Sequence, residues 1–155
     1  MKLIHKNLVF LNKDFKDNQA ALSYLSSKVE QTGYAKNTYH TAVIEREKKF
    51  PTGLPTGDIC VAIPHADSIH VNKSTLAVMT LKKAIAFHNM GDPDNTLPVS
   101  IIIMMAIAEP KGQLAMLQKI MGIVQDQKHL KALITYDTQF DLYSDLKNTF
   151  QEIDI

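Results

Sequence analysis

Two short segments of the chain contain residue types that can hold an anion and carry a chemical group. The first is Arg46-Glu47-Lys48-Lys49-Phe50-Pro51-Thr52-Gly53-Leu54, and the second is Val61-Ala62-Ile63-Pro64-His65. The imidazole of His65 can accept and release a group near neutral pH. We therefore predict one site that combines this histidine with the Arg46 guanidinium and the Thr52 hydroxyl.

Arg46 is the one arginine among 17 basic residues, and all the others are lysine. Its planar guanidinium can donate two parallel hydrogen bonds to a phosphate or a carboxylate, which an ammonium group cannot do. The alternative interpretation is a cation at the end of a helix, where the helix dipole favours positive charge. The two interpretations are compatible.

The predicted secondary structure places both residues at the ends of elements. The apolar run 59–63 predicts a buried strand, and Pro64 forces the chain to turn because it has no backbone N–H. His65 then lies beyond the carboxyl end of a strand, where α/β sheets bind ligands. Arg46 belongs to a predicted helix that begins after an Asn37 cap and ends before Pro51.

The rest of the chain alternates between strand and helix patterns. We predict further strands at 8–11, 75–81, 84–87 and 99–106, with a turn-rich stretch at 91–95. Helices are predicted from the Asp17 cap to Gly33, along the apolar stripe 114–124, after an Asp126 cap, and after a Thr138 cap paired with Asp141. This pattern predicts a single α/β domain over residues 1–155, with a mixed, mainly parallel sheet flanked by helices on both faces.

Composition limits the class of protein. A chain of 155 residues with 45 % hydrophobic content is long enough for one buried core. The net charge of +1 gives no basic footprint, so we expect no nucleic acid partner. The N-terminal residues do not resemble a signal peptide, and the apolar stretch 99–108 is too short to span a membrane. With its single cysteine, the chain is expected to be a soluble cytoplasmic protein.

Nearly the whole chain resembles the enzyme IIA components of the bacterial sugar phosphotransferase system, within the fructose/mannitol-type superfamily. The galactitol-like branch of that superfamily is the most similar. The resemblance rests on five motifs: Arg46-Glu47, Pro51-Thr52-Gly53, Ala62-Ile63-Pro64-His65, Pro98-Val99, and Leu114-x-x-Leu117.

This resemblance implies a phosphoryl carrier, a phosphotransferase with a phosphohistidine intermediate. Such a carrier takes the phosphoryl group from phosphorylated HPr and passes it to a cysteine of a IIB component, while the membrane IIC permease admits the sugar. The family's acceptor histidine corresponds to His65 and its arginine to Arg46. Thr52 and backbone N–H groups after His65 are candidate donors to the phosphoryl oxygens. No metal or cofactor is expected.

The chain departs from the mannitol-type pattern at two positions. Ala66-Asp67 follows the histidine in place of a glycine, and Gln113 stands where many relatives have a second histidine. A neutral amide can donate or accept a hydrogen bond but cannot titrate. The second departure argues against a mechanism that needs two imidazoles, and it leaves open whether Gln113 or His40 assists His65.

Two other functions fit parts of the pattern. A nitrogen-type regulatory IIA paralogue would carry phosphate on His65 but act by binding target proteins. A metal-dependent hydrolase would use His65 and His70, although the spacing lacks a second ligand pair. Cys60 is interpreted as a small buried residue that faces away from His65 along the strand. The transported sugar cannot be identified from the sequence.

Overall fold

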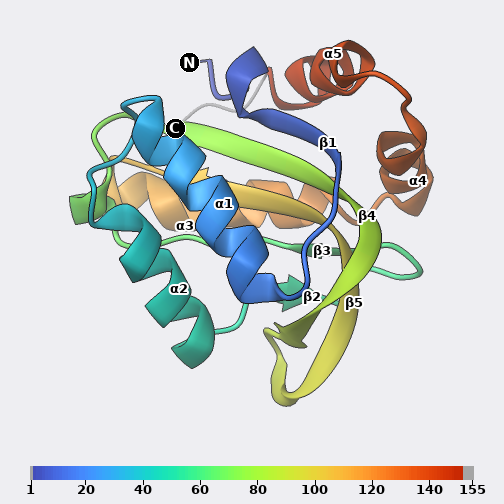
Figure 1. The fold of residues 1–155 in the computed structure, drawn as a ribbon, viewed down its shortest axis with the longest axis horizontal. Coiled ribbons are helices and arrows are strands. Elements are labelled where there is room, and N and C mark those ends of the chain that lie inside the picture. Colours follow the sequence, from blue (N-terminus) through green and yellow to red (C-terminus); the bar gives the residue numbers. More distant parts are fainter. Residues whose placement is uncertain (1, 152–155) are drawn as a thin grey trace.

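The computed structural model describes residues 2–151, which form one sheet with helices packed against it (Figure 1). The strands are β1 (Val9–Lys13), β2 (Gly53–Leu54), β3 (Cys60–Ala62), β4 (Thr75–Asn89) and β5 (Asp92–Ala106). The helices are α1 (Asn18–Gln31), α2 (Tyr39–Lys49), α3 (Pro110–Ile123), α4 (Gln127–Thr135) and α5 (Gln139–Phe150). Residue 1 and residues 152–155, which the single-domain prediction also covers, lie outside the described part of the chain.

The sheet is mixed, with strand order β1-β4-β2-β3-β5 and a further pairing of β4 with β5. Three of these five pairings are parallel: β1 with β4, β2 with β4, and β3 with β5. The most extensive pairing is nevertheless antiparallel, because β4 and β5 form a long hairpin that runs from Thr75 opposite Ala106 to Asn89 opposite Asp92. The predicted α/β class with a mixed sheet is confirmed.

The side chains of β5 alternate between two hydrophobic clusters, as the two-residue period of a strand requires. Ile101, Ile103 and Met105 pack with residues of α3, α4 and α5, whereas Ile102 and Met104 pack with residues of α1 and α2. Figure 1 shows α1 and α2 in front of the sheet and α3 behind it. Both faces are therefore covered, as predicted, and the apolar run in β5 reflects burial on two sides.

Most of the helix ends predicted from capping residues and glycine agree with the structure. The predicted caps Asp17, Asp126 and Thr138 each accept a hydrogen bond from the backbone N–H three residues later, which satisfies one free donor of the first turn. Gly33, with φ of +86°, follows the end of α1. The predicted Asn37 cap is wrong by one residue. Thr38 occupies the N-cap position of α2, and its side chain makes no capping bond.

The strand predictions need three corrections. The two strands predicted at 75–81 and 84–87 are one continuous strand, β4, with an irregularity in pairing between Thr80 and Ile85. The turn-rich stretch 91–95 is not a loop, because β5 begins at Asp92 and makes a tight hairpin with β4. The short strand β2 was not predicted. It joins β3 and β4, and an added Cβ at Gly53 would lie 2.6 Å from the His88 carbonyl oxygen.

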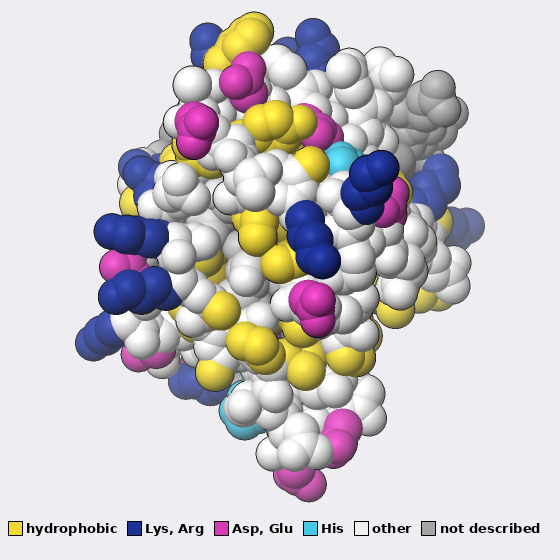
Figure 2. All heavy atoms as spheres, turned by 90° about the vertical axis from the view of Figure 1, so that its right-hand side faces the viewer, with side chains coloured by type: hydrophobic (Ala, Val, Ile, Leu, Met, Phe, Trp, Pro, Cys, Tyr) yellow, Lys and Arg dark blue, Asp and Glu magenta, His cyan; other side chains and the backbone are white. Residues whose placement is uncertain are grey.

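Figure 2 shows the face that carries the tip of the β4–β5 hairpin. Basic, acidic and apolar side chains are interspersed on this face, and acidic side chains mark the hairpin tip at its lower end. Asp92 and Asp94 are exposed there. None of the helices described between residues 2 and 151 is long and apolar enough to cross a membrane.

Candidate functional site

The position of His65 is fixed by backbone contacts on both sides of Pro64. β3 ends at Ala62, and His65 makes an isolated parallel bridge with Met105 of β5. The Met105 N–H donates to the Pro64 carbonyl at 3.0 Å, and the buried Tyr39 hydroxyl of α2 donates to the Met105 carbonyl at 2.6 Å. The predicted turn at Pro64 is wrong, because the chain stays alongside β5 in unchanged register, with Ala62 opposite Ile102 and His65 opposite Met105. His65 nevertheless lies beyond the end of β3, as predicted.

The imidazole of His65 is 6 % exposed, and its Nδ1 lies 2.9 Å from the carbonyl oxygen of Ile63. Since a carbonyl can only accept, Nδ1 carries the proton in this contact and Nε2 retains its lone pair. Burial lowers the pKa of His65 below its ordinary value of 6.5, and the charge of Arg46 lowers it further. The Ile63 carbonyl and Asp67 act in the opposite direction. The lowered pKa favours the neutral ring at neutral pH.

We expect the titration midpoint of His65 to fall below 6.5, so that more than half of the rings are still neutral at that pH. Protonation removes the lone pair of Nε2, so phosphoryl acceptance should decline only as the pH falls through this lowered pKa. The measurement is a proton NMR titration of the His65 ring, assigned by its loss in His65→Ala. A midpoint above 6.5 would show that Asp67 and the carbonyl outweigh burial.

Arg46 lies in the last turn of α2, with its guanidinium directed toward the loop after His65. Its Nη1 is 3.8 Å from Oδ1 of Asp67, and its Cζ is 5.2 Å from the centre of the Phe50 ring. Its Nε is buried and has no hydrogen-bond partner within residues 2–151. The Asp67 side chain is 71 % exposed, so this ion pair contributes little stability. The guanidinium is therefore free to change partners.

The structure assigns the Thr52 hydroxyl to a different partner from the one expected. Thr52 is buried, and its Oγ1 donates to both carboxylate oxygens of Glu47 at 2.9 Å. Its backbone N–H also donates to Oε1 of Glu47, at 3.0 Å. Both donors of Thr52 are engaged inside the protein. In this arrangement the hydroxyl holds the loop between α2 and β2, and its role as a donor to phosphoryl oxygens stays a prediction.

Gln113 lies near the start of α3, and its Nε2 donates to the carbonyl oxygen of Ala66 at 2.6 Å. The amide therefore reaches the residue next to His65. This contact ties the loop after His65 to α3, on the sheet face opposite to α2.

Replacing Gln113 with alanine should slow phosphoryl transfer by about 2- to 12-fold, because one hydrogen bond that orients the His65 loop is lost. His65 should remain labelled. Gln118→Ala is the matched control, since Gln118 is an exposed glutamine on the same helix. Single-turnover rates with phosphorylated HPr measure the effect. If both variants transfer at the wild-type rate, Gln113 has no part in the site.

The other candidate side chains near the site have partners elsewhere. His40 binds Glu30 of α1 through Nδ1 at 2.7 Å, which links the two helices. His70 Nδ1 lies 2.8 Å from the Thr38 hydroxyl. Over residues 2–151, no group of three or more His, Cys, Asp or Glu side chains is arranged to hold a metal ion. Cys60 is buried, and its thiol donates to the Gly57 carbonyl at 3.4 Å.

Residues 2–149 match the family described as phosphoenolpyruvate-dependent sugar phosphotransferase system, EIIA 2. The chain belongs to this EIIA family. The galactitol-specific EIIA component of Escherichia coli K12 is 30 % identical over 130 residues, which cover 83 % of this chain and 86 % of the relative. EIIA components are phosphotransferases, and the predicted family is confirmed.

Two solved EIIA structures have the same fold at lower identity. Mannitol IIA of Escherichia coli, solved with phosphorylated mannitol IIB, superposes with a TM-score of 0.77 at 18 % identity, over 95 % of this chain and 98 % of that chain. The nitrogen regulatory protein IIA-Ntr of Neisseria meningitidis superposes with a TM-score of 0.73 at 21 % identity, over 93 % of this chain and 96 % of that chain. At these identities the two structures establish the fold alone.

The sequence of this EIIA chain predicted neither a role for Glu47 nor the contact of Asp67 with Arg46. For Glu47 a signal was present, because Tyr39, Val43 and Glu47 follow one another at intervals of four and form the buried face of α2. A carboxylate that continues an apolar stripe requires a buried partner. For Asp67 the contact with Arg46 joins the loop after His65 to α2, and no local pattern could predict it.

Proposed function

We propose that this EIIA chain is a cytoplasmic phosphoryl carrier that accepts its phosphoryl group on His65. The group would come from phosphorylated HPr and pass to a cysteine of a IIB component, during uptake of galactitol or a related polyol through a IIC permease. The observation that carries the proposal is the hydrogen bond from Nδ1 of His65 to the Ile63 carbonyl. This bond occupies Nδ1 and leaves Nε2 as the nitrogen that can react. The chain belongs to a family of phosphotransferases, so the reacting group is a phosphoryl group.

In the proposed step, Nε2 of His65 forms a bond to phosphorus as the N–P bond of the donor breaks. The donor ring leaves with the electron pair of that bond, and the proton on Nδ1 of His65 stays in its hydrogen bond to Ile63. Transfer then needs positioning and stabilisation of the phosphoryl oxygens, with little further covalent chemistry. The reverse sequence at Nε2 would deliver the group to the IIB thiolate.

Arg46 would supply the charge that the phosphoryl oxygens require. Its present partner Asp67 is exposed and 3.8 Å away, so exchanging that carboxylate for a phosphoryl group costs little. The guanidinium would then donate two charge-assisted hydrogen bonds. The ring of Phe50 supports its aliphatic and planar parts on one side.

Protein partners are supported by exposed apolar side chains in the segments that build the site. Phe50 follows α2, Ile69 follows the His65 loop, and Leu114 is next to Gln113 on α3; they are 60 %, 69 % and 63 % exposed. Apolar side chains around a reactive group suit docking of another protein. The galactitol-specific relative, which is 30 % identical over 83 % of this chain, favours a transport role over a regulatory one.

The test is incubation of the chain with labelled phosphoenolpyruvate, enzyme I and HPr, followed by a panel of IIB components that includes the galactitol type. We expect acid-labile, alkali-stable label on the chain, followed by transfer to a IIB cysteine as an S–P bond. Label that forms on the chain but moves to no IIB component would instead support a regulatory carrier. A chain that accepts no label would contradict the proposed function.

A further inference from the structure

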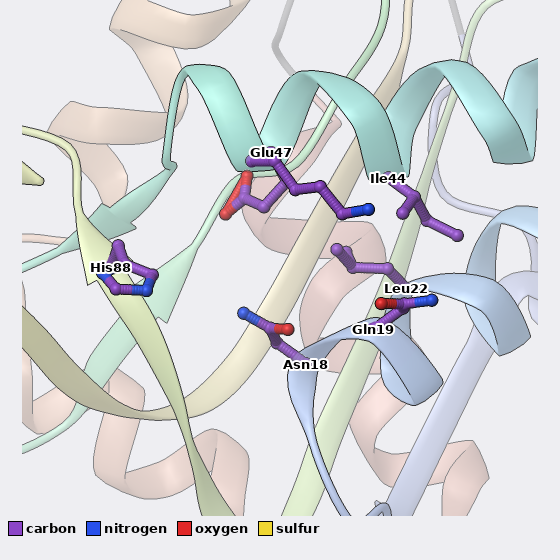
Figure 3. Close-up of a pocket in the computed structure, with 7 residues that line it drawn as sticks. Asn18, Gln19, Leu22, Ile44, Glu47 and His88 are labelled. Atoms are coloured by element: carbon purple, nitrogen blue, oxygen red, sulfur yellow. The ribbon is translucent and has the colours of Figure 1, made fainter.

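Glu47 is a buried carboxyl group that the proposed transfer does not use directly. The residue is 7 % exposed, and burial raises its pKa to about 7 although Thr52 and Arg46 favour its charged form. Figure 3 shows its side chain leaving α2 beside a cavity of about 230 Å³ between α1, α2 and β4. A carboxyl group placed there costs stability unless its contacts offset the burial.

The contacts of Glu47 converge on a single residue. Its two oxygens accept from both donors of Thr52: the backbone N–H bonds to Oε1 at 3.0 Å, and the single hydroxyl proton is shared between Oε1 and Oε2, each 2.9 Å from Oγ1. Thr52 stands between the end of α2 and the start of β2. Glu47 therefore fixes where the chain enters β2.

A continuous set of hydrogen bonds leads from Thr52 to the reactive ring. The Ile63 N–H donates to the Thr52 carbonyl at 3.2 Å, and the Ile63 carbonyl accepts from Nδ1 of His65 at 2.9 Å. The pairing of β2 with β3 extends this link, with Gly53 opposite Ala62. One residue, Ile63, thus receives its position from Thr52 and orients His65.

We propose that Glu47 is a positioning residue for His65, which acts through Thr52 and Ile63 to hold the proton on Nδ1 and keep Nε2 reactive. This inference rests on the proposed phosphoryl transfer at His65. Glu47 touches neither the ring nor the phosphoryl group. Its effect is to keep the Ile63 carbonyl at the distance and angle that favour one tautomer of the ring.

The remaining contacts of the site explain why losing Glu47 should loosen the ring without unfolding the protein. Pro64 is held independently by the Met105 N–H, and Met105 by the Tyr39 hydroxyl. The cavity beside Glu47 gives a leucine side chain room at this position. The variant Glu47→Leu removes the acceptor, whereas Glu47→Gln keeps one acceptor oxygen and the same shape.

The first measurement is the tautomer of His65, from two-bond proton–nitrogen NMR spectra at pH 8, where the ring is neutral. Wild type and Glu47→Gln should show the Nδ1–H form, and Glu47→Leu and Thr52→Val should show a mixture. Glu45→Leu is the matched control, because Glu45 is an exposed glutamate two residues away on the same helix. This experiment requires no phosphorylation, so it tests the positioning role even if His65 proves not to be the acceptor.

The second measurement is steady-state transfer from phosphorylated HPr. We expect Glu47→Leu to lower kcat by about 3- to 15-fold with KM for HPr unchanged, and Glu47→Gln to recover most of the loss. The double variant Glu47→Leu/Thr52→Val should be no slower than Glu47→Leu alone, because both residues act through the same series of hydrogen bonds to Ile63 and His65. Should Glu47→Leu fail to fold, Thr52→Val makes the same comparison with an isosteric side chain.

An unchanged tautomer together with unchanged kcat in Glu47→Leu and Thr52→Val would overturn the inference. An equal loss in Glu45→Leu would also overturn it, because the effect would then reflect helix charge. By contrast, wild-type protein that shows the Nδ1–H tautomer but accepts no label would contradict the proposed function and leave the positioning role supported.

Discussion

His65→Ala should accept no phosphoryl group from phosphorylated HPr, while the protein keeps its fold. Within the proposed relay this side chain forms the bond to phosphorus, so no neighbouring group can replace it. Within residues 2–151 the ring makes one side-chain hydrogen bond, to the Ile63 carbonyl, and the backbone at Pro64 is held separately by the Met105 N–H. Labelling with phosphoenolpyruvate, enzyme I and HPr measures the loss, and circular dichroism with thermal unfolding checks the fold.

His40→Ala and His70→Ala are the controls for this experiment. Both residues have partners away from His65, namely Glu30 and Thr38. Both variants should keep full, acid-labile and alkali-stable label, because an N–P bond breaks when the ring is protonated. Label that persists in His65→Ala but disappears in either control would move the phosphoryl site to another histidine.

The parts of the fold that depend on local chemistry could be predicted from the sequence. The caps Asp17, Asp126 and Thr138 satisfy donors only three residues away, so the signal and its effect lie within one helical turn. The apolar run in β5 likewise encodes burial on both faces without reference to other segments. Its predicted start at 99 was late because the polar residues from Asp92 onward pair with β4 outside the core.

Features that depend on distant segments were missed. β2 has two residues, and its existence depends on the close backbone approach of Gly53 to His88, which no pattern around Gly53 reveals. In the site, the spacing of Arg46 and His65 predicted which residues belong together but not what Thr52 would contact. A hydroxyl five residues after a glutamate can face a ligand or that glutamate. Glu47 lies on the buried face of α2, and this position decides for the contact with the glutamate.

The site separates its two charged side chains across α2. Glu47 and Arg46 are adjacent in sequence but lie on different sides of α2, so the carboxylate is buried under the helix and the guanidinium reaches the loop. The Arg46 charge lowers the pKa of His65 and of Glu47 alike. The charge of Arg46 thus adds to burial in favouring the neutral His65 ring, and it opposes burial in favouring the ionised carboxylate that binds Thr52.

Arg46→Lys should slow phosphoryl transfer by roughly 10- to 150-fold, which corresponds to the loss of one charge-assisted hydrogen bond of about 1.5–3 kcal/mol. Lysine keeps the positive charge but not the planar pair of donors that matches phosphoryl oxygens. His65 should therefore still become labelled, more slowly, in rapid-quench measurements with phosphorylated HPr. The stability of the folded protein should change little, because the pair with Asp67 is exposed.

Lys48→Met is the matched control, since it removes a neighbouring positive charge from an exposed position on the same helix. If transfer depended only on general charge attraction between α2 and its protein partners, Lys48→Met would be slowed, whereas Arg46→Lys, which keeps its charge, would not, and the rates would fall further at high salt. A specific contact with the phosphoryl group would leave Lys48→Met within about 2-fold of wild type, because screened surface charges have small effects. Wild-type rates in Arg46→Lys would show that the single arginine of the chain serves only as a cation at the end of α2, with its guanidinium shape irrelevant to transfer.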